Sequence, residues 1–348
     1  MSDALKPFIA KLVAGQDLTQ AEAEQSLDTI MAGEATDAQI AAWLTALRMK
    51  GETVAEIAGA VRAMRARVVP IPLDHPVILD TCGTGGDGAG TFNISTAVAF
   101  VCAAAGVVVA KHGNRAISSS VGSADVLEAL GLRIDLNAHQ VKHCIDTLGI
   151  GFMFAPTHHS ALRHAAPARR QLGFRTILNL LGPMTNPANA THQLIGLFDR
   201  TRLATVARVL DGLGSRRALV VHGDDGLDEL TITGPTHAVA LDQGSITEHT
   251  LDPGDYGVER SPITTVAGGD AAYNAGIVRR VLSGETGPPA DIVRLNAGAA
   301  LWAAERAPSI GEGVAQATQI LASGQAWKTL ASLAALTQAL GASDGTST

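Results

Sequence analysis

The sequence has few aromatic residues, few cysteines and no long hydrophobic run. Aromatic residues make up 3% of the 348 positions, and three cysteines form no Cys-x-x-Cys pair: Cys82, Cys102 and Cys144. This usage predicts reduced thiols in a cytoplasmic protein rather than a disulfide scaffold. The longest apolar run, 97–110, is too short to span a bilayer, and the acidic start does not resemble a signal peptide. We therefore expect no membrane association.

Basic charge is also scarce. The chain has 26 Lys and Arg against 33 Asp and Glu, for a formal net charge of −7. This balance argues against a general nucleic-acid or membrane surface, although it leaves room for a local basic pocket. Internal repeats and low-complexity segments are absent from the sequence. The length suits one large domain and one smaller one.

The first 72 residues are predicted to be helical. Three threonines each stand three residues before Glu or Gln, as in a capping box: Thr19 and Glu22, Thr36 and Gln39, Thr53 and Glu56. Gly33 and Gly51 are expected to end the first two of these helices, and a further helix is expected near 5–13. The resulting domain, 1–72, ends in a linker that contains Pro70 and Pro72. One face of this bundle is expected to meet a second copy of the chain.

From residue 73 to 345 the pattern alternates between strands and helices before ending in a helical tail. Strands are predicted at 77–79, 107–110, 177–178, 218–222 and 238–241. Helices are predicted at 95–105, 123–130, 138–148, 160–171 and 201–213. This alternation indicates an α/β domain with a mainly parallel central sheet. Ligands of such sheets bind beyond the carboxyl ends of the strands.

A glycine-rich stretch, Asp80–Gly90, follows the first of these strands and precedes a helix that begins with hydroxyl-bearing residues. Glycines let backbone N–H groups approach an anion, and a helix start offers unpaired N–H donors, so the stretch predicts a phosphate site. Asp87 within it suggests that a magnesium ion accompanies the phosphate. The stretch also matches the dinucleotide fingerprint, but Lys111 ends the next strand where a ribose-binding acid would stand.

Two further segments fit the same chemistry. The segment 111–120 carries Lys111, Arg115, an amide and several hydroxyls, which suit phosphate oxygens. Four carboxylates cluster after the strand 218–222, at Asp224, Asp225, Asp228 and Glu229. Such a cluster is either a hard-cation site or a solvent-exposed acidic turn, and the phosphate segments favour the cation.

The segment 157–170 combines histidines and arginines. Arg169 is suited to pair a substrate carboxylate, with a surface ion pair as the alternative. A zinc site of His158, His159 and His164 lacks a completing Cys or Glu. No nucleophile–base spacing stands out, so we assign no covalent or acid–base catalytic residue. These features together suit the transfer of a group away from a pyrophosphate.

Several motifs occur in the order found in one known family. They are 83–88 (Gly-Thr-Gly-Gly-Asp-Gly), 93–96 (Asn-Ile-Ser-Thr), 111–115 (Lys-His-Gly-Asn-Arg), 122–125 (Gly-Ser-Ala-Asp), 181–187 (Leu-Gly-Pro-Met-Thr-Asn-Pro) and 228–229 (Asp-Glu). On these motifs the chain resembles the anthranilate phosphoribosyltransferases of tryptophan biosynthesis. The resemblance implies a nucleoside phosphorylase-like fold in which helices around 160–190 join the N-terminal domain. It also implies a homodimer and two Mg²⁺ ions per subunit.

The resemblance further implies a reaction and a set of binding residues. The reaction joins 5-phosphoribosyl 1-diphosphate to the amine of anthranilate and releases diphosphate. The implied ligands of the phosphoribosyl diphosphate are Gly83, Gly86, Asp87, Thr91, Asn93, Ile94, Ser95, Thr96, Lys111, His112, Gly113, Asn114, Arg115, Ala116, Ile117, Ser118, Ser119 and Ser123. The implied metal ligands are Ser95, Asp228 and Glu229, and anthranilate would contact Gly83, Asn114 and Arg169, with His112 and His159 lining its channel.

One departure and two alternatives accompany the resemblance. Many family members carry a lysine between the serines after the Asn-Arg pair, whereas this chain has Ser120-Val121, which weakens the expected grip on phosphate. A pyrimidine nucleoside phosphorylase and a non-catalytic nucleic-acid-binding relative are the alternatives. The net charge and the intact Asp228-Glu229 pair argue against the latter. Association with an anthranilate synthase is left open.

Overall fold

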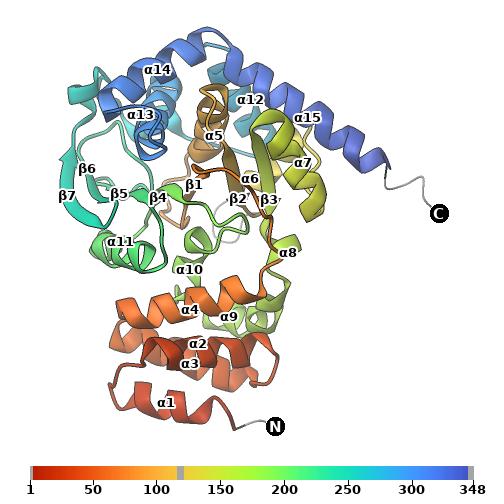
Figure 1. Ribbon diagram of the computed structural model, residues 1–348. Helices are drawn as coiled ribbons and strands as arrows, with labels where there is room; N and C mark the ends of the chain where they lie inside the picture. The colour runs from red at the N-terminus through yellow and green to blue at the C-terminus, as the bar shows by residue number, and fades with distance from the viewer. Residues whose placement is uncertain (1–2, 116–120, 344–348) are drawn as a thin grey trace.

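The computed structural model describes residues 3–115 and 121–343 of the chain. Figure 1 shows a helical bundle at one end of the molecule and an α/β part at the other, joined by segments of the chain that pass between them. Within the described residues, no helix has the length and apolar character needed to cross a membrane.

The bundle is built largely from helices whose starts carry the predicted capping boxes. Its first four helices are α1 (Lys6–Val13), α2 (Gln20–Met31), α3 (Asp37–Lys50) and α4 (Val54–Arg67). All three capping boxes are present, at the starts of α2, α3 and α4. Gly51 caps α3, and Gly33 follows α2 with a positive φ of 75°. These glycines end the helices because they adopt backbone conformations that other residues avoid.

A later part of the chain returns to the bundle. It comprises α8 (Ala155–His158), η1 (Ser160–Ala165), α9 (Ala166–Leu172), α10 (Leu178–Leu181) and η2 (Gly182–Met184). The helix predicted at 160–171 is divided in two because Pro167, in the first turn of α9, has no N–H to continue a helix. The strand predicted at 177–178 is wrong. Asn179 Oδ1 accepts the Thr176 N–H at 3.0 Å, and the chain turns into α10 there.

The central sheet has seven strands in the order β3-β2-β1-β4-β5-β6-β7. Its strands are β1 (Leu79–Gly83), β2 (Val109–Gly113), β3 (Ile150–Phe154), β4 (His192–Gly196), β5 (Arg217–Gly223), β6 (Thr236–Asp242) and β7 (Ser245–Leu251). The first five in this order pair in parallel, and β6 and β7 are antiparallel. The mainly parallel sheet is therefore confirmed.

Three strands, β3, β4 and β7, were not predicted from the sequence, and β1 and β2 are displaced from their predicted positions. β4 contains the buried polar residues His192 and Gln193, and most of β7 is exposed, so neither reads as an apolar run. β3 has glycine at its second position, which interrupts its apolar run. Strands β1 and β2 extend through 80–83 and 111–113, which were predicted to be loop. Cys82 consequently lies in a strand and not in the glycine loop.

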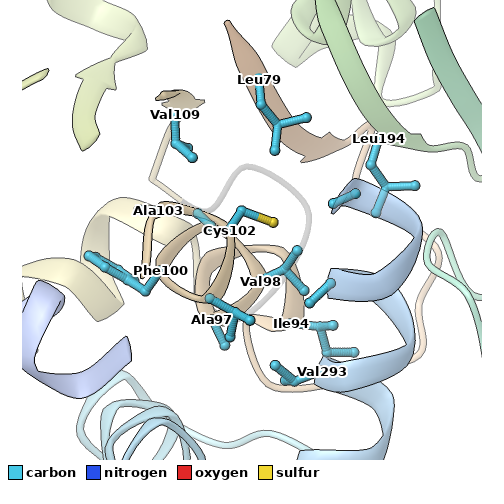
Figure 2. Packing of buried hydrophobic residues seen from close by; sticks show 14 of the residues in the cluster. Leu79, Ile94, Ala97, Val98, Phe100, Cys102, Ala103, Val109, Leu194 and Val293 are labelled. Atoms are coloured by element: carbon cyan, nitrogen blue, oxygen red, sulfur yellow. The ribbon is translucent and has the colours of Figure 1, made fainter. Parts of the chain in front are cut away.

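Helices cover both faces of the sheet. One face carries α5 (Ile94–Ala104), and its side also includes α6 (Ser123–Ala129), α7 (Ala138–Leu148), α12 (Ala271–Leu282), α13 (Pro288–Ala303), α14 (Ile310–Ala322) and α15 (Gln325–Ser343). Figure 2 shows Val98 and Cys102 of α5 facing Leu79 and Leu194 of the sheet. The other face packs on α11 (Leu203–Gly212) in a core that continues into the bundle.

Alternation along β5 explains this division into two cores. Leu219 and Val221 belong to the core on the α5 side, whereas Ala218 and Val220 belong to the core shared with the bundle. Successive side chains of a strand point to opposite faces, so a strand buried on both faces must be apolar throughout. The bundle is therefore part of the same packed structure as the sheet.

Candidate active site

The candidate site lies at the carboxyl ends of β1, β2 and β5, where three of the predicted segments meet. The end of β1 supplies Gly83 and the loop after it Asp87. The loop after β5 supplies Asp228 and Glu229, and β2 supplies Lys111. Strand order places β1 next to both β2 and β4, at the centre of the five parallel strands. This is the edge at which parallel sheets bind their ligands.

Glycines allow the loop after β1 to approach a carboxylate closely. Gly85 and Gly86 have positive φ values of 64° and 76°. The Gly85 N–H donates to Asp228 Oδ2 at 2.7 Å, and the Asp228 N–H lies 3.5 Å from Asp87 Oδ2. A Cβ atom at Gly83 would lie 2.4 Å from Asp228 Oδ2, so only glycine fits. The loop and Asp228 thus form one hydrogen-bonded unit.

The four carboxylates after β5 separate into two pairs. Asp228 and Glu229 are buried, and burial together with the charge of neighbouring carboxylates raises the pKa of each. Asp224 is turned outward to His237 at 3.2 Å, and Asp225 Oδ2 accepts the hydroxyls of Thr231 and Thr233. Only the first pair faces the glycine loop, so the exposed-turn interpretation applies to Asp224 and Asp225, which are both exposed.

The buried pair fits a divalent cation. Two adjacent buried carboxylates with raised pKa values carry more negative charge than the neighbouring Lys111 balances, and a hard cation would supply the remainder. Among residues 3–115 and 121–343 there is no cluster of three or more His, Cys, Asp or Glu side chains able to enclose a metal. A set of two carboxylates instead suits Mg²⁺, which takes its remaining ligands from water and substrate phosphate.

Lys111 is a buried cation beside these carboxylates. Its Nζ donates to Thr81 O at 2.6 Å and lies 3.4 Å from Ser95 Oγ. Burial lowers the pKa of Lys111, and the nearby carboxylates of Asp80 and Glu229 oppose the shift. The ammonium group is therefore held at the base of the site, next to the start of α5.

The start of α5 forms the wall beside Lys111. The sequence predicted Ile94, Ser95 and Thr96 as phosphate ligands, and they form the first turn of α5, which has no side-chain cap hydrogen bond. Thr96 Oγ1 is buried without a partner in the part of the chain that the structure describes. A free buried hydroxyl at a helix start suits an anion, although the Ile94 N–H already donates to Phe92 O at 2.8 Å. Thr91 forms a β-bridge to Ala267 beside this turn.

Asn93 is held by a neighbouring element. Its Oδ1 accepts the Asn274 Nδ2–H at 3.1 Å, and its own Nδ2 donates to Val121 O at 3.4 Å. Asn274 also accepts the Gly269 N–H at 2.7 Å. The 268–270 turn therefore supports the residues that precede α5.

The segment after β2 is only partly defined. Ser123 Oγ donates to Asn114 O at 3.4 Å, and a Cβ atom at Gly113 would lie 2.2 Å from Ser123 Oγ. Arg115 pairs with Asp125 at 2.8 Å and Glu128 at 2.5 Å, so its charge is directed to α6. The predicted ligands Ala116, Ile117, Ser118 and Ser119 lie outside the described residues, as does Ser120 of the departure from the family pattern.

A cavity of about 440 Å³ adjoins the start of the glycine loop. It extends between the carboxyl ends of β1 and β2 and the returning helices α8 to α10. Gly83, Asn114 and Arg169 all line it, so the structure brings together the three residues predicted to contact anthranilate. Burial lowers the pKa of Arg169. The guanidinium group is therefore partly desolvated, which strengthens its attraction for a carboxylate.

Histidines form a neutral wall of the cavity. The rings of His112 and His159 lie 4.9 Å apart, and both residues line the cavity. Burial and mutual repulsion lower the pKa of His112 well below its usual value, and burial together with His158 lowers the pKa of His159 to about 4. His158 contacts Val69 O at 3.1 Å, while His164 lies against Gly33, so the three histidines do not form a zinc site.

Three polar residues of the site were not predicted. The Arg175 guanidinium lies 3.9 Å from the Phe198 ring centroid, and a Cβ atom at Gly86 would lie 2.6 Å from its Nη2. Asp80 and Asn186 are buried side by side below Lys111, with Asn186 Nδ2 donating to Asp80 Oδ2 at 2.7 Å. Their partners are distant in sequence, so only the position of Asn186 in the 181–187 motif could have pointed to this pair.

Comparisons with known proteins agree with this architecture. Residues 6–68 match the model of a glycosyl transferase helical bundle domain, and residues 75–327 match the model of a glycosyl transferase α/β domain. The fold and these two matches thus define a glycosyl transferase.

Sequence and structure relatives identify the family within the glycosyl transferases. The chain is 56% identical to the anthranilate phosphoribosyltransferase of Moorella thermoacetica, over 92% of this chain and 95% of the relative. It is 52% identical to that of Symbiobacterium thermophilum, over 94% and 96%. A crystal structure of the Thermus thermophilus enzyme superposes with a TM-score of 0.91 at 45% identity, over 97% of this chain and 100% of that one. The chain belongs to the anthranilate phosphoribosyltransferase family.

A more distant relative carries ligands. The Saccharomyces cerevisiae enzyme, in complex with PRPP and Mg, superposes with a TM-score of 0.88 at 27% identity. The two chains cover 97% and 99% of each other. The fold described above is therefore one that binds a phosphoribosyl diphosphate and a magnesium ion in that protein.

Proposed function

We propose that this chain transfers the 5-phosphoribosyl group of 5-phosphoribosyl 1-diphosphate to the amine of anthranilate, in the second step of tryptophan biosynthesis from chorismate. The observation that carries the proposal is a cavity, lined by Arg169, that opens directly onto the glycine loop. Gly83, the last residue of β1, lines the cavity and leads directly into the loop, so a carboxylate-bearing acceptor and a phosphate-bearing donor would meet there. Family membership supports the same reaction.

The donor would be bound by residues of both loops and the start of α5. These are the ligands named from the sequence: Gly83, Gly86, Asp87, Thr91, Asn93 to Thr96, Lys111 to Arg115 and Ser123, together with 116–119. Backbone N–H groups of the loop and of the helix start would take phosphate oxygens. The Lys111 ammonium group would stabilise charge on the departing diphosphate. Arg115 would have to leave Asp125 and Glu128 to take part.

We further propose that two Mg²⁺ ions bind each subunit through Ser95, Asp228 and Glu229. The buried carboxylate pair supports this assignment, and the hydrogen bond between the Ser95 backbone and the Glu229 carboxylate places Ser95 beside it. The bound ions would neutralise the diphosphate as a leaving group. Asp228 would at the same time fix the glycine loop through the Gly85 N–H.

The acceptor would be oriented rather than activated by the protein. Arg169 would pair the carboxylate of anthranilate, with Asn114 and Gly83 beside it. The amine of an aromatic ring is unprotonated at neutral pH, so no strong base is required. The uncharged His112 and His159 rings would line the acceptor channel without repelling a cationic centre at the ribose.

We also propose that the chain works as a cytoplasmic homodimer with two domains. The helical domain would comprise 1–72 together with the helices around 160–190, and the catalytic domain the rest of 73–345. Val13 and Met49, on the contacting helices α1 and α3, are 73% and 83% exposed, which supports the bundle as the dimer interface. The three free cysteines suit a reducing compartment.

The fluorescence of anthranilate provides the test of the reaction. Anthranilate, 5-phosphoribosyl 1-diphosphate and Mg²⁺ are mixed with the protein, and the signal is followed as the amine is consumed. We expect a magnesium-dependent decay that the double variant Asp228→Ala/Glu229→Ala abolishes. Asp224→Ala is the matched control, because it removes an outward carboxylate of the same loop and should leave the decay unchanged.

Two results would contradict the proposal. Folded protein that consumes no anthranilate, yet releases pentose phosphate from thymidine or uridine with inorganic phosphate, would indicate the phosphorylase. A shift of single-stranded DNA at low salt without either reaction would indicate the nucleic-acid-binding relative.

A further inference from the structure

The sheet is split between β1 and β2. The two strands share a single register pair, Leu79 with Val109, whereas β1 pairs with β4 along five residues and β2 pairs with β3 along five. Beyond Leu79, the facing edges of β1 and β2 therefore lack the ladder hydrogen bonds of a parallel sheet. Buried backbone groups need partners, so something else must satisfy these edges.

Side chains replace the missing ladder. Asp80 Oδ1 accepts the His112 N–H at 3.1 Å, and Asn186 Nδ2 donates to Ala110 O at 2.9 Å. Asn186 Nδ2 also donates to Asp80 Oδ2 at 2.7 Å, so the two side chains form one unit across the split. On the β1 edge, Thr81 O accepts the Lys111 ammonium at 2.6 Å.

From this geometry we infer that Asp80 and Asn186 are positioning residues for the transfer reaction. They form a wedge that holds β1 and β2 apart and so creates the space into which Lys111 extends. The same wedge holds the His112 N–H, and the following residues Gly113 and Asn114 line the acceptor cavity. One buried pair therefore fixes the donor side and the acceptor side of the site.

The wedge also contacts the segments of the chain that connect the bundle to the α/β part. Asn186 follows η2, where the chain returns from the bundle to β4, and its Oδ1 accepts the Ala188 N–H at 2.9 Å. The neighbouring Pro187 O accepts the Ile71 N–H at 3.0 Å, which ties this return to the linker after α4. The position of the wedge is thus set by the linker after α4 and by the segment that returns from the bundle to β4.

This inference rests on the proposed function, and Asp80→Asn is its first test. The substitution keeps the size of the side chain but places an amide donor against the Asn186 amide donor. We expect kcat/KM for the phosphoribosyl diphosphate to fall about 10- to 100-fold, mainly through KM, in protein that remains folded. Asn186→Ser, which shortens the partner but keeps a donor, is the second variant and should act in the same direction.

A reciprocal exchange separates positioning from general damage. In Asp80→Asn/Asn186→Asp the donor and the acceptor change places, so the hydrogen bond between positions 80 and 186 can form again. We expect the double variant to recover part of the kcat/KM that Asp80→Asn loses. No recovery, with KM no better than in Asp80→Asn, would count against the wedge.

Thr191→Val is the matched control. Thr191 Oγ1 accepts the Ile78 N–H at 3.1 Å, so it also replaces a backbone partner beside β1, but at the end of the strand away from the site. The control should lower the unfolding midpoint and leave KM and kcat within about twofold of the parent.

The outcomes distinguish this inference from the proposed function. An inactive parent protein overturns the proposed function. An active parent whose Asp80→Asn and Asn186→Ser variants retain the parental KM and kcat overturns the wedge alone. Equal losses of activity in Thr191→Val would likewise reduce Asp80 and Asn186 to structural residues.

Discussion

Single residues at the site are constrained by distances shorter than a methyl group needs. A Cβ atom at Gly83 would lie 2.4 Å from Asp228 Oδ2. The Gly83 backbone does not have the positive φ that would by itself exclude alanine. We therefore expect Gly83→Ala to displace Asp228 and to lower kcat/KM by about 100-fold while leaving most of the fold stability. Initial rates together with urea unfolding measure both effects.

The matched control for Gly83→Ala is Gly212→Ala. Gly212 ends α11, and a Cβ atom there would meet no atom within 4 Å. Alanine favours a helix by about 0.5–1 kcal/mol over glycine, so this variant should be as active as the parent and no less stable. Equal activity of Gly83→Ala and Gly212→Ala would contradict the close approach of Asp228.

The buried His159 makes stability depend on pH. Burial and His158 lower the pKa of His159 from 6.5 to about 4, so the unfolded chain binds more protons than the folded chain between these values. The stabilisation is complete above pH 6.5, and stability falls as the pH falls toward 4, by roughly 3 kcal/mol for this residue. Urea unfolding at several pH values measures the slope.

His159→Phe should reduce this dependence and leave the share of His112, whose pKa burial also lowers. The substitution retains an aromatic ring beside His112 but removes the group that titrates. His139→Asn, which changes an exposed histidine at the start of α7, should keep the parental slope. An unchanged slope in His159→Phe would show that another group is responsible.

At the scale of elements, Glu56 connects the ends of three bundle helices. Its carboxylate accepts the Leu18 N–H at 2.9 Å and the Thr53 N–H at 2.8 Å, and pairs with Lys50 at 2.9 Å. The side chain is fully buried. Glu56→Ala leaves these donors without an acceptor and should cost about 3–5 kcal/mol.

A single cap provides the comparison for Glu56. Thr36→Ala removes one hydroxyl that accepts the Gln39 N–H at 3.3 Å at the start of α3. Loss of such a cap costs about 1 kcal/mol. Chemical unfolding of both variants measures the two losses of stability. A smaller loss for Glu56→Ala than for Thr36→Ala would contradict the role of Glu56 in connecting the three helix ends.

These examples show what the sequence can reveal about the elements. A capping box is local, so Thr19, Thr36 and Thr53 could be identified from spacing alone. The glycine loop and the Asp228-Glu229 pair could be recognised because their chemistry lies within a few consecutive residues. Asp80 and Arg175 could not, because Asp80 contacts Asn186 and Arg175 contacts Phe198 only in the folded chain.

For the whole molecule, the shared core predicts one cooperative unfolding transition. Bundle residues such as Trp43 belong to the same apolar cluster as Val220 and Leu241 of the sheet. The bundle and the sheet should therefore unfold together, although the sequence suggested two separate domains. The three tryptophans allow a direct check, since Trp43 lies in the bundle and Trp302 and Trp327 lie in the α/β part.

The check compares two fluorescence reporters. Trp43→Phe leaves the signal of the α/β part, and Trp302→Phe/Trp327→Phe leaves that of the bundle. For each variant, the unfolding midpoint from fluorescence is compared with the midpoint from far-ultraviolet circular dichroism. We expect the two midpoints to coincide in both variants. A bundle signal that changes well before the circular dichroism would show that the bundle unfolds independently.

The split between β1 and β2 also has a consequence for the order of folding. Strands β2 and β3 form one laddered block, and β1, β4, β5, β6 and β7 form another. Apart from the single Leu79–Val109 pair, side chains far apart in sequence align the two blocks, so the alignment is completed only when Asn186 arrives beside Asp80. The site would then be the last part of the sheet to form, and substitutions at Asp80 and Asn186 would accelerate unfolding far more than they slow folding.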